Sequence, residues 1–278
     1  MMLRRSKSRT PAPMQTVDDR FQYGPSEHAA YQDRGYYLFD HFLTPEAVAD
    51  YQARVRDMLA RRHESVPPEM MIGVHQIEPW IFDIAAQPKL LDMIEHQIGP
   101  DILLWASHML CKPPHTGDAV PWHQDAPYWN ISGRFSAGVW IAFDDVDEQN
   151  GAMSVLPGWH KKGTFPVQDS HSIKGFHSEI VPAQLPDDLD QRRVPYILNA
   201  GQMGIHDVMI PHNSPPNTSD RWRLVLVFRY IAADAQLGPN TYHNYKNGQP
   251  FEREFTLMRG RDVQNLGLRR SPFEKSTA

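Results

Sequence analysis

The chain has 278 residues, a net charge of −5 from 28 Lys and Arg against 33 Asp and Glu, and one cysteine, Cys111. This length accommodates one large domain or two small ones, the lack of a basic excess argues against a nucleic-acid partner, and one cysteine excludes an internal disulfide framework and fits a reducing compartment. No run approaches the ~18 apolar residues that span a bilayer, so we expect a soluble, cytoplasmic protein with no membrane partner, either monomeric or homodimeric.

The first part of the chain predicts a tail, a helix and a strand. Residues 1–24 are polar and contain prolines, so we expect a disordered N-terminal tail. Ser26 can cap a short helix that runs to about Arg34 and ends at Gly35. Residues 36–40 are rich in strand-forming side chains and predict a short strand.

Two longer helices are predicted next. Thr44 is a capping residue followed by proline and an acidic side chain, and apolar residues then recur at spacings of three and four to about Arg62. A second amphipathic helix follows Pro88, and Gly99-Pro100 ends it. The intervening residues 66–80 predict a loop that lies over a pocket.

The pattern changes after residue 101. Short runs of strand-forming residues alternate there with Gly, Pro and Asn, which indicates a sandwich or barrel and not βαβ units. The predicted strands are 102–111, 120–126, 136–144, 153–156, 177–182, 194–199, 203–210 and 222–231. We therefore expect a mainly β fold with flanking helices and a double-stranded β-helix core, the jelly-roll or cupin-like type.

We expect one domain over residues 25–260, with no boundary or internal repeat within it. The segment from about Asp234 is polar with interspersed aromatic residues, and it is expected to pack back over the barrel or to form part of its mouth. Residues 261–278 are expected to be a loose C-terminal tail.

A His-x-Asp pair at His123 and Asp125 is the strongest chemical signal in the sequence. Residues two apart on a strand point to the same side, so both side chains can reach one ion. With a second histidine they would form the 2-His-1-carboxylate set of non-heme Fe(II) oxygenases, which leaves positions open for small molecules. His212, which precedes a polar turn, is the candidate third ligand, and His206 is its main competitor. Arg223 follows on the next predicted strand, where its guanidinium could hold a dicarboxylate cosubstrate.

Together with further motifs, these residues resemble the phytanoyl-CoA dioxygenase family of Fe(II)- and 2-oxoglutarate-dependent oxygenases over about residues 30–230. The motifs are His123-x-Asp125, Gly151-Ala152 with Pro157-Gly158-Trp159-His160, and His212-x-Ser214 with Asn217-x-Ser219 and Arg223. Two features depart from the family pattern. Trp159 stands where the family has serine, and the family's occasional lysine before the second helix has no counterpart around His75-Gln76.

The resemblance implies roles for particular residues. His123, Asp125 and His212 would bind Fe(II). Arg223, assisted by Ser214, would bind the distal carboxylate of 2-oxoglutarate, and Trp140 would line the pocket of that cosubstrate. The side chains assigned to the substrate pocket are Trp122, Tyr128, Trp129 and Gln76, and an aromatic wall of this kind suits an apolar, planar or cationic substrate.

The reaction that the resemblance implies is hydroxylation of an unactivated C–H bond of a small metabolite, a natural product or an amino-acid-like compound. It consumes O2 and 2-oxoglutarate and releases succinate and CO2. Desaturation or cyclisation would use the same ligands. Two alternatives from other classes are a non-catalytic jelly-roll protein that binds a small molecule, and a zinc hydrolase, for which Arg223 would have no role.

Overall fold

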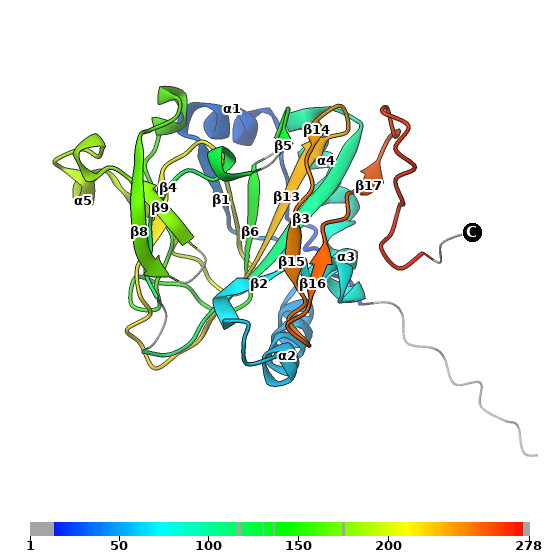
Figure 1. Ribbon diagram of the computed structural model, residues 1–278, viewed down its shortest axis with the longest axis horizontal. Coiled ribbons are helices and arrows are strands. Elements are labelled where there is room, and N and C mark those ends of the chain that lie inside the picture. The colour runs from blue at the N-terminus through cyan, green and yellow to red at the C-terminus, as the bar shows by residue number, and fades with distance from the viewer. Residues whose placement is uncertain (1–13, 116–117, 130, 136, 174–175, 275–278) are drawn as a thin grey trace, which may run out of the picture.

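Two β-sheets packed face to face form the centre of the molecule, and helices cover the outer face of the larger sheet (Figure 1). This computed structural model describes residues 14–115, 118–129, 131–135, 137–173 and 176–274, with the side chains of Tyr128 and residues 171–177 excepted. The larger sheet has seven strands in the order β1-β11-β6-β13-β3-β17, with β2 paired to β3, and the smaller has the order β10-β7-β12-β4. This is the arrangement of the predicted jelly roll.

The elements follow one another from a largely helical first third into a largely β remainder. The α-helices are α1 (Pro25–Arg34), α2 (Pro45–Arg61), α3 (Pro79–Ala85), α4 (Pro88–Ile98) and α5 (Leu189–Arg192). The short 3₁₀ helices are η1 (Pro68–Met70), η2 (Val74–Gln76), η3 (Ala126–Tyr128), η4 (Trp159–Lys162) and η5 (Pro182–Gln184). The strands are β1 (Tyr36–Phe39), β2 (Met71–Ile72), β3 (Ile102–Lys112), β4 (Val120–His123), β5 (Ile131–Ser132), β6 (Gly138–Ala142), β7 (Ser154–Val155), β8 (Val167–Ile173), β9 (Phe176–Ile180), β10 (Val194–Pro195), β11 (Met203–His206), β12 (His212–Ser214), β13 (Arg223–Ala232), β14 (Gln236–Leu237), β15 (Thr241–His243), β16 (Pro250–Glu252) and β17 (Thr256–Arg259).

The three predicted helices are confirmed, with one correction at a cap. α2 begins after Thr44, whose Oγ1 accepts a hydrogen bond from the Ala47 N–H at 3.2 Å. α1 ends at Gly35, which adopts the left-handed conformation at φ 78°. Its N-cap is Gly24 and not Ser26, because Pro25 occupies the first helical position, where the missing N–H has no consequence.

Each predicted strand overlaps an observed one, but several are shorter, because turns follow β4, β10 and β11 sooner than the residue pattern suggests. The short strands β2, β5 and β14–β17, the β8 arm of a hairpin, and helix α3 within the predicted loop 66–80 were not predicted. Of these, β2, β5, β14 and β17 depend on pairing with segments that are distant in the sequence.

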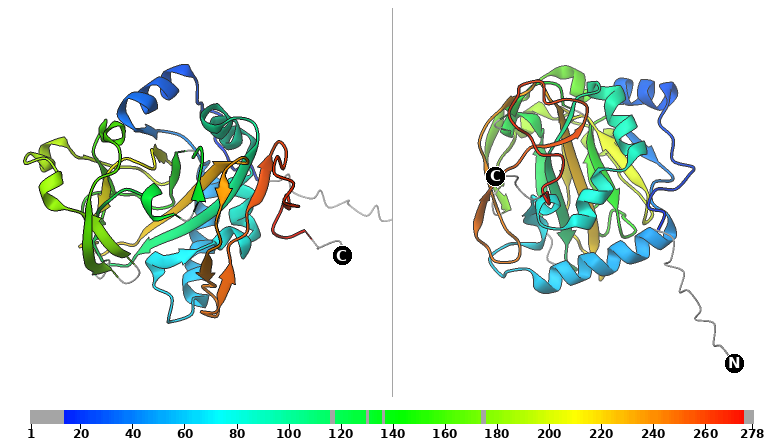
Figure 2. Two further views of the ribbon diagram at one scale, coloured as in Figure 1. Left: turned by 45° about the horizontal axis from the view of Figure 1, so that its top comes forward. Right: turned by 90° about the vertical axis from the view of Figure 1, so that its right-hand side faces the viewer.

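Alternation along β13 separates the helix-covered face of the larger sheet from its inner face. Leu224, Leu226 and Phe228 belong to the main core, which also contains buried residues of α2, α3 and α4. Figure 2 shows these helices against that side of the sheet. Arg223 and Arg229 have the opposite parity and face the space between the two sheets.

The predicted N-terminal tail is too long. Val17 and Phe21 are buried, and Phe21 packs edge-on against Phe39 and Phe42 with ring centroids 5.2 and 5.1 Å apart. Apolar contact therefore fixes the chain before Pro25, whereas residues 1–13 lie outside the described part.

The segment that follows β17 is also held against the protein and is not loose as expected. The side-chain amide of Gln264 donates to the carbonyl oxygens of Ala233 and Ala235, each at 2.7 Å. Leu268 packs against the buried cluster that contains Trp105, Ile231 and Ala233. Within the described residues, no helix is both long enough and apolar enough to span a lipid bilayer.

Candidate metal centre and active-site cavity

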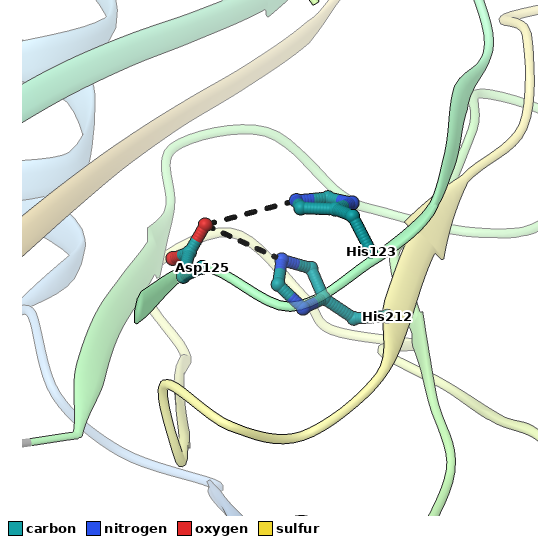
Figure 3. A group of neighbouring side chains, drawn as sticks. All are labelled: His123, Asp125 and His212. Atoms are coloured by element: carbon teal, nitrogen blue, oxygen red, sulfur yellow. Dashed lines mark ion pairs between the residues drawn. The ribbon is translucent and has the colours of Figure 1, made fainter. Parts of the chain in front are cut away.

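Pairing between β4 and β12 brings the three predicted metal ligands together. His123 ends β4, and in the antiparallel register it lies opposite His212, the first residue of β12. Asp125 follows β4 in a turn that is held by a hydrogen bond from its N–H to the Val208 carbonyl oxygen at 3.0 Å. Figure 3 shows the two imidazoles and the carboxylate pointing toward one another. One donor atom of each side chain lies within 4.8 Å of the others.

Both imidazoles present the same nitrogen to the carboxylate. The Nε2 atoms of His123 and His212 lie 3.7 and 3.9 Å from Oδ1 of Asp125. Their Nδ1 atoms are engaged behind the site, at 2.8 Å from the Pro121 carbonyl oxygen and 3.0 Å from the Ile210 carbonyl oxygen. Because a carbonyl only accepts, each Nδ1 carries a proton, and this contact turns the Nε2 edge of each ring toward the carboxylate, as in histidines that bind metals.

Burial and charge suit these groups to a cation. Burial, together with neighbouring His123, holds the pKa of His212 well below its usual value, so its imidazole is neutral. Burial alone would raise the pKa of Asp125, but the charge of Arg229 and the two histidines bring it well below the usual value. Two imidazoles and one carboxylate form the ligand set that suits a divalent transition metal such as iron.

Arg229 holds the second oxygen of Asp125, which the sequence analysis did not anticipate. Its Nη2 and Nε donate to Oδ2 at 3.0 and 3.2 Å. Oδ1 is thereby left as the oxygen that faces the histidines. The signal was present in the sequence, because Arg229 has the same strand parity as Arg223 and therefore faces the same interior space.

These side chains line a cavity of about 470 Å³ between the two sheets. Its wall comprises Glu69, Met70, Ile72, Trp105, Ala106, His108, Leu110, Lys112, Val120, His123, Asp125, Trp129, Trp140, Met153, Ser178, His206, His212, Asn213, Ser214, Arg223, Val227, Arg229, Asn240 and Tyr242. The volume lies within the ~300–1,000 Å³ that is usual for small-molecule sites.

One end of the cavity is built around Arg223. Its Nη1 donates to Oγ of Ser214 at 2.7 Å and to the carbonyl oxygen of Gly151, and its Cζ lies 5.9 Å from the ring centre of Trp140. Gly151 has φ 85°, and a Cβ there would lie 2.7 Å from the Pro215 carbonyl oxygen, so this close approach requires glycine.

The Arg223 guanidinium has no acidic partner among the described residues. Its side chain is buried, and its Nε has no hydrogen-bond partner there. Burial lowers the pKa of Arg223 to about 10, so the group stays charged at neutral pH. A buried charge is normally paired, so this end is suited to binding an anion.

The opposite end of the cavity is aromatic. Trp129 and Trp105 pack edge to face with ring centroids 4.5 Å apart, and Tyr242 and Asn240 from the C-terminal part of the chain complete the wall. The expectation that the segment after Asp234 forms part of the mouth therefore agrees with the positions of these two residues.

The residues predicted for the substrate pocket have three outcomes. Trp129 lines the cavity, whereas Trp122 and Gln76 are not among its lining residues. The side-chain amide of Gln76 instead lies 3.5 Å from the Glu252 carbonyl oxygen. The side chain of Tyr128 lies outside the described part.

His206, the competing third ligand, is a neighbour of the His123–Asp125–His212 cluster and not a member of it. It lines the cavity from β11, with its ring centre 5.1 Å from that of His212. Burial lowers its pKa to about 4. Within the described residues, the cluster of possible metal ligands contains His123, Asp125 and His212 only.

The family model described as phytanoyl-CoA dioxygenase matches residues 31–225. A probable alpha-ketoglutarate-dependent hypophosphite dioxygenase of Stutzerimonas stutzeri is 28% identical over 237 residues, which cover 78% of this chain and 82% of that protein. The peroxisomal phytanoyl-CoA dioxygenase of Mus musculus is 24% identical over 66% of this chain and 56% of its own length. An L-proline trans-4-hydroxylase of Streptomyces griseoviridis is 26% identical over 57% of this chain and 65% of its own length.

Solved structures show the same fold. The apo form of a non-heme monooxygenase, ThoJ, superposes with a TM-score of 0.66 and 25% identity, covering 84% of each chain. A non-heme alpha-ketoglutarate-dependent carbocyclase from nogalamycin biosynthesis gives a TM-score of 0.60 at 20% identity over 87% of this chain and 97% of its own. These likenesses confirm the predicted jelly-roll core.

Proposed function

The chain belongs to the phytanoyl-CoA dioxygenase family of iron- and 2-oxoglutarate-dependent oxygenases, and we propose that it hydroxylates an unactivated C–H bond of a small metabolite. The chemistry that iron and 2-oxoglutarate supply when bound is activation of O2 and oxidation of a C–H bond, with succinate and CO2 as coproducts. The catalytic domain would extend over residues 25–260.

The proposed metal ligands are Nε2 of His123, Nε2 of His212 and Oδ1 of Asp125. The observation that carries this assignment is the convergence of both Nε2 atoms on one carboxylate oxygen, with both Nδ1 atoms engaged by backbone carbonyls. The protein thus orients the ligands before a metal arrives. Arg229, by holding the other oxygen of Asp125, favours attachment through Oδ1 alone.

The proposed anchor for 2-oxoglutarate is Arg223. Its unpaired, buried guanidinium can bind the distal carboxylate through charge-assisted hydrogen bonds. Ser214 fixes the guanidinium from one side and Trp140 lies against it. This arrangement favours an oxygenase over the alternative of a zinc hydrolase, for which the buried Arg223 would have no role.

The proposed substrate is small. A cavity of about 470 Å³ must hold both 2-oxoglutarate and the substrate, which leaves little space for a long acyl thioester. The names of two relatives, a hypophosphite dioxygenase and a proline hydroxylase, support a small molecule.

Succinate release tests the proposal directly. The protein, supplied with Fe(II), 2-oxoglutarate and O2, is offered a panel of amino-acid-like and natural-product compounds, and the expected result is succinate formation above the substrate-free rate. Incorporation of one labelled oxygen from ¹⁸O2 into the product identifies hydroxylation, whereas loss of two hydrogens would identify desaturation or cyclisation. Binding of Fe(II) without a 2-oxoglutarate-dependent absorption band would refute the proposal and favour a non-catalytic binding protein.

A further inference from the structure

Two arginines flank a pair of tryptophans at the aromatic end of the cavity. The Cζ of Arg229 lies 5.3 Å from the ring centre of Trp129, which packs against Trp105, and the Cζ of Arg253 lies 5.3 Å from the ring centre of Trp105. Trp105, Trp129 and Arg229 line the cavity, and Arg253 lies behind that wall. Two positive charges are thus placed around one pair of indole rings.

Arg253 is buried without an anionic partner among the described residues. Only 7% of it is exposed. Its Nη2 donates to the Gly238 carbonyl oxygen at 2.8 Å, while Nε and Nη1 have no hydrogen-bond partner within the described part. Burial lowers the pKa of the Arg253 guanidinium, with the Tyr242 hydroxyl acting in the opposite direction. Because burying an unpaired charge is costly, such a group normally has a counter-charge nearby.

Further donors at this end are also unused. Trp105 is 3% exposed, and its indole Nε1 has no hydrogen-bond partner within the described residues. Arg229, which lines the cavity, uses Nε and Nη2 on Asp125, and its Nη1 makes no hydrogen bond within the described residues. Tyr242 lies within the electrostatic influence of both guanidiniums, which oppose the rise that burial causes in its pKa.

The charge at this end is therefore not balanced by the protein. Among the described residues, Asp125 is the one carboxylate that pairs with either arginine, and under the proposed function it also binds the metal. That carboxylate pairs with Arg229 only, and the charge of Arg253 is left without a partner among the described residues. Arg223 likewise lacks an acidic partner at the other end, where under the proposed function the distal carboxylate of 2-oxoglutarate would pair with it.

We infer that the substrate carries an anionic oxygen group, a carboxylate or a phosphorus oxyanion, which binds at this end of the cavity against Arg229 and the Trp105–Trp129 pair. The anion accepts a hydrogen bond from Nη1 of Arg229 and offsets the charge of Arg253 behind the wall. This inference rests on the proposed function, since it names the substrate class of that site. Because Arg229 also contacts Asp125, a proposed metal ligand, its guanidinium lies between that carboxylate and the anion. The carbon that reacts is therefore within a few bonds of the anionic group.

Matched probes that differ in charge test the inference. The protein is loaded with Fe(II) and saturating 2-oxoglutarate without O2, so that Arg223 is occupied and no turnover occurs. Calorimetric titrations then compare hexanoate, hexylphosphonate and the uncharged hexanamide. The expected result is that at least one anion binds about tenfold or more tightly than the amide, as for a charge-assisted contact of about 1.4 kcal/mol or more. A tighter hexanoate identifies a carboxylate site and a tighter hexylphosphonate a phosphorus oxyanion site.

Variants assign the preference to these side chains. Arg253→Gln and Arg229→Gln should each reduce the preference for the anion severalfold, and Arg253→Lys should retain most of it. Trp105→Phe keeps an aromatic ring but removes Nε1, so it should weaken binding of the anions and leave binding of hexanamide unchanged. Arg261→Gln is the matched control, because its side chain is 84% exposed and does not line the cavity. Melting temperatures identify any variant that fails to fold. The folded variants then show which side chains cause the preference for the anion.

Two outcomes overturn the inference. One is equal binding of hexanamide and both anions to the wild-type protein, and the other is an unchanged preference in Arg229→Gln, Arg253→Gln and Trp105→Phe. Since these titrations need no turnover, they are independent of the oxidation itself. Substrate-stimulated succinate release without a preference for anions would remove the inference and leave the proposed function standing.

Discussion

Both ends of the cavity have a buried arginine with unused hydrogen-bond donors nearby, but the surrounding residues differ. At one end Arg223, which lies on β13, is surrounded by Ser214 and Gly151 and has no acidic partner among the described residues. At the other end Arg229 pairs with Asp125, and Arg253 lies unpaired behind two tryptophans. In both places a buried guanidinium with unused donors indicates where a ligand anion belongs. The metal-binding group lies beside the second of these ends.

The largest expected effect follows from removing a proposed metal ligand. Asp125→Ala or His212→Ala should lower 2-oxoglutarate-dependent succinate formation by more than about 1,000-fold, because the remaining ligands no longer fix the metal. The rate is measured with Fe(II) at saturating 2-oxoglutarate, and Arg261→Gln serves as the control. Undiminished turnover in a folded Asp125→Ala variant would remove this carboxylate from the mechanism.

Arg223→Ala should affect binding of 2-oxoglutarate without affecting binding of Fe(II). We expect the concentration of 2-oxoglutarate at half-maximal rate to rise by about 100-fold, since a buried charge-assisted contact of about 2–5 kcal/mol is lost. Fe(II) binding, followed by titration without cosubstrate, should be unchanged. If the requirement for 2-oxoglutarate stays the same, the assignment of this end to the cosubstrate is wrong.

Arg229→Gln tests the end that contacts the metal ligand. Release of Oδ2 of Asp125 should weaken Fe(II) binding by about 10–30-fold, within the range seen when a partner of a metal ligand is removed. The change in half-saturating 2-oxoglutarate, measured at saturating Fe(II), should be much smaller than in Arg223→Ala. A variant with normal Fe(II) affinity would show that Asp125 is oriented without Arg229.

Ser214→Ala gives the smallest effect and refines the description of the Arg223 end. The lost hydrogen bond to Nη1 is worth about 1 kcal/mol, so half-saturating 2-oxoglutarate should rise about fivefold. Steady-state succinate assays measure this shift, and Thr at the same position should restore most of the affinity because it keeps the hydroxyl. An effect as large as that of Arg223→Ala would mean that Ser214 contacts the cosubstrate itself.

The two ends also differ in how far the sequence predicts them. His123 and Asp125 come from the His-x-Asp pattern, His212 and Arg223 from their places beside predicted strands, and Ser214 from the family resemblance. Strand alternation then directs Arg223 into the cavity. The same alternation places Arg229 in the cavity, but its pairing with Asp125 depends on the turn after β4, which no local pattern specifies.

The aromatic end was largely missed, because it is assembled from segments that are remote in sequence. Trp105 has the side-chain type of a core residue, and Tyr242 and Arg253 belong to a polar stretch whose strands form only by pairing with each other. Trp122 and Gln76, which were predicted for the pocket, are not among the residues that line the cavity. Proximity to a motif along the chain does not establish the direction of a side chain.

Arg223 and Arg229 lie six residues apart on β13, which is hydrogen-bonded to β6 on one side and β3 on the other. At about 3.4 Å per residue their α-carbons are separated by roughly 20 Å, and a strand clamped along both edges cannot stretch or shorten. Under the proposed assignments, the cosubstrate and the substrate are therefore held at a constant separation. A homologous series of acids should then show one preferred chain length, with oxidation always at the same number of bonds from the charged terminus, so that regioselectivity follows from the backbone of a single strand.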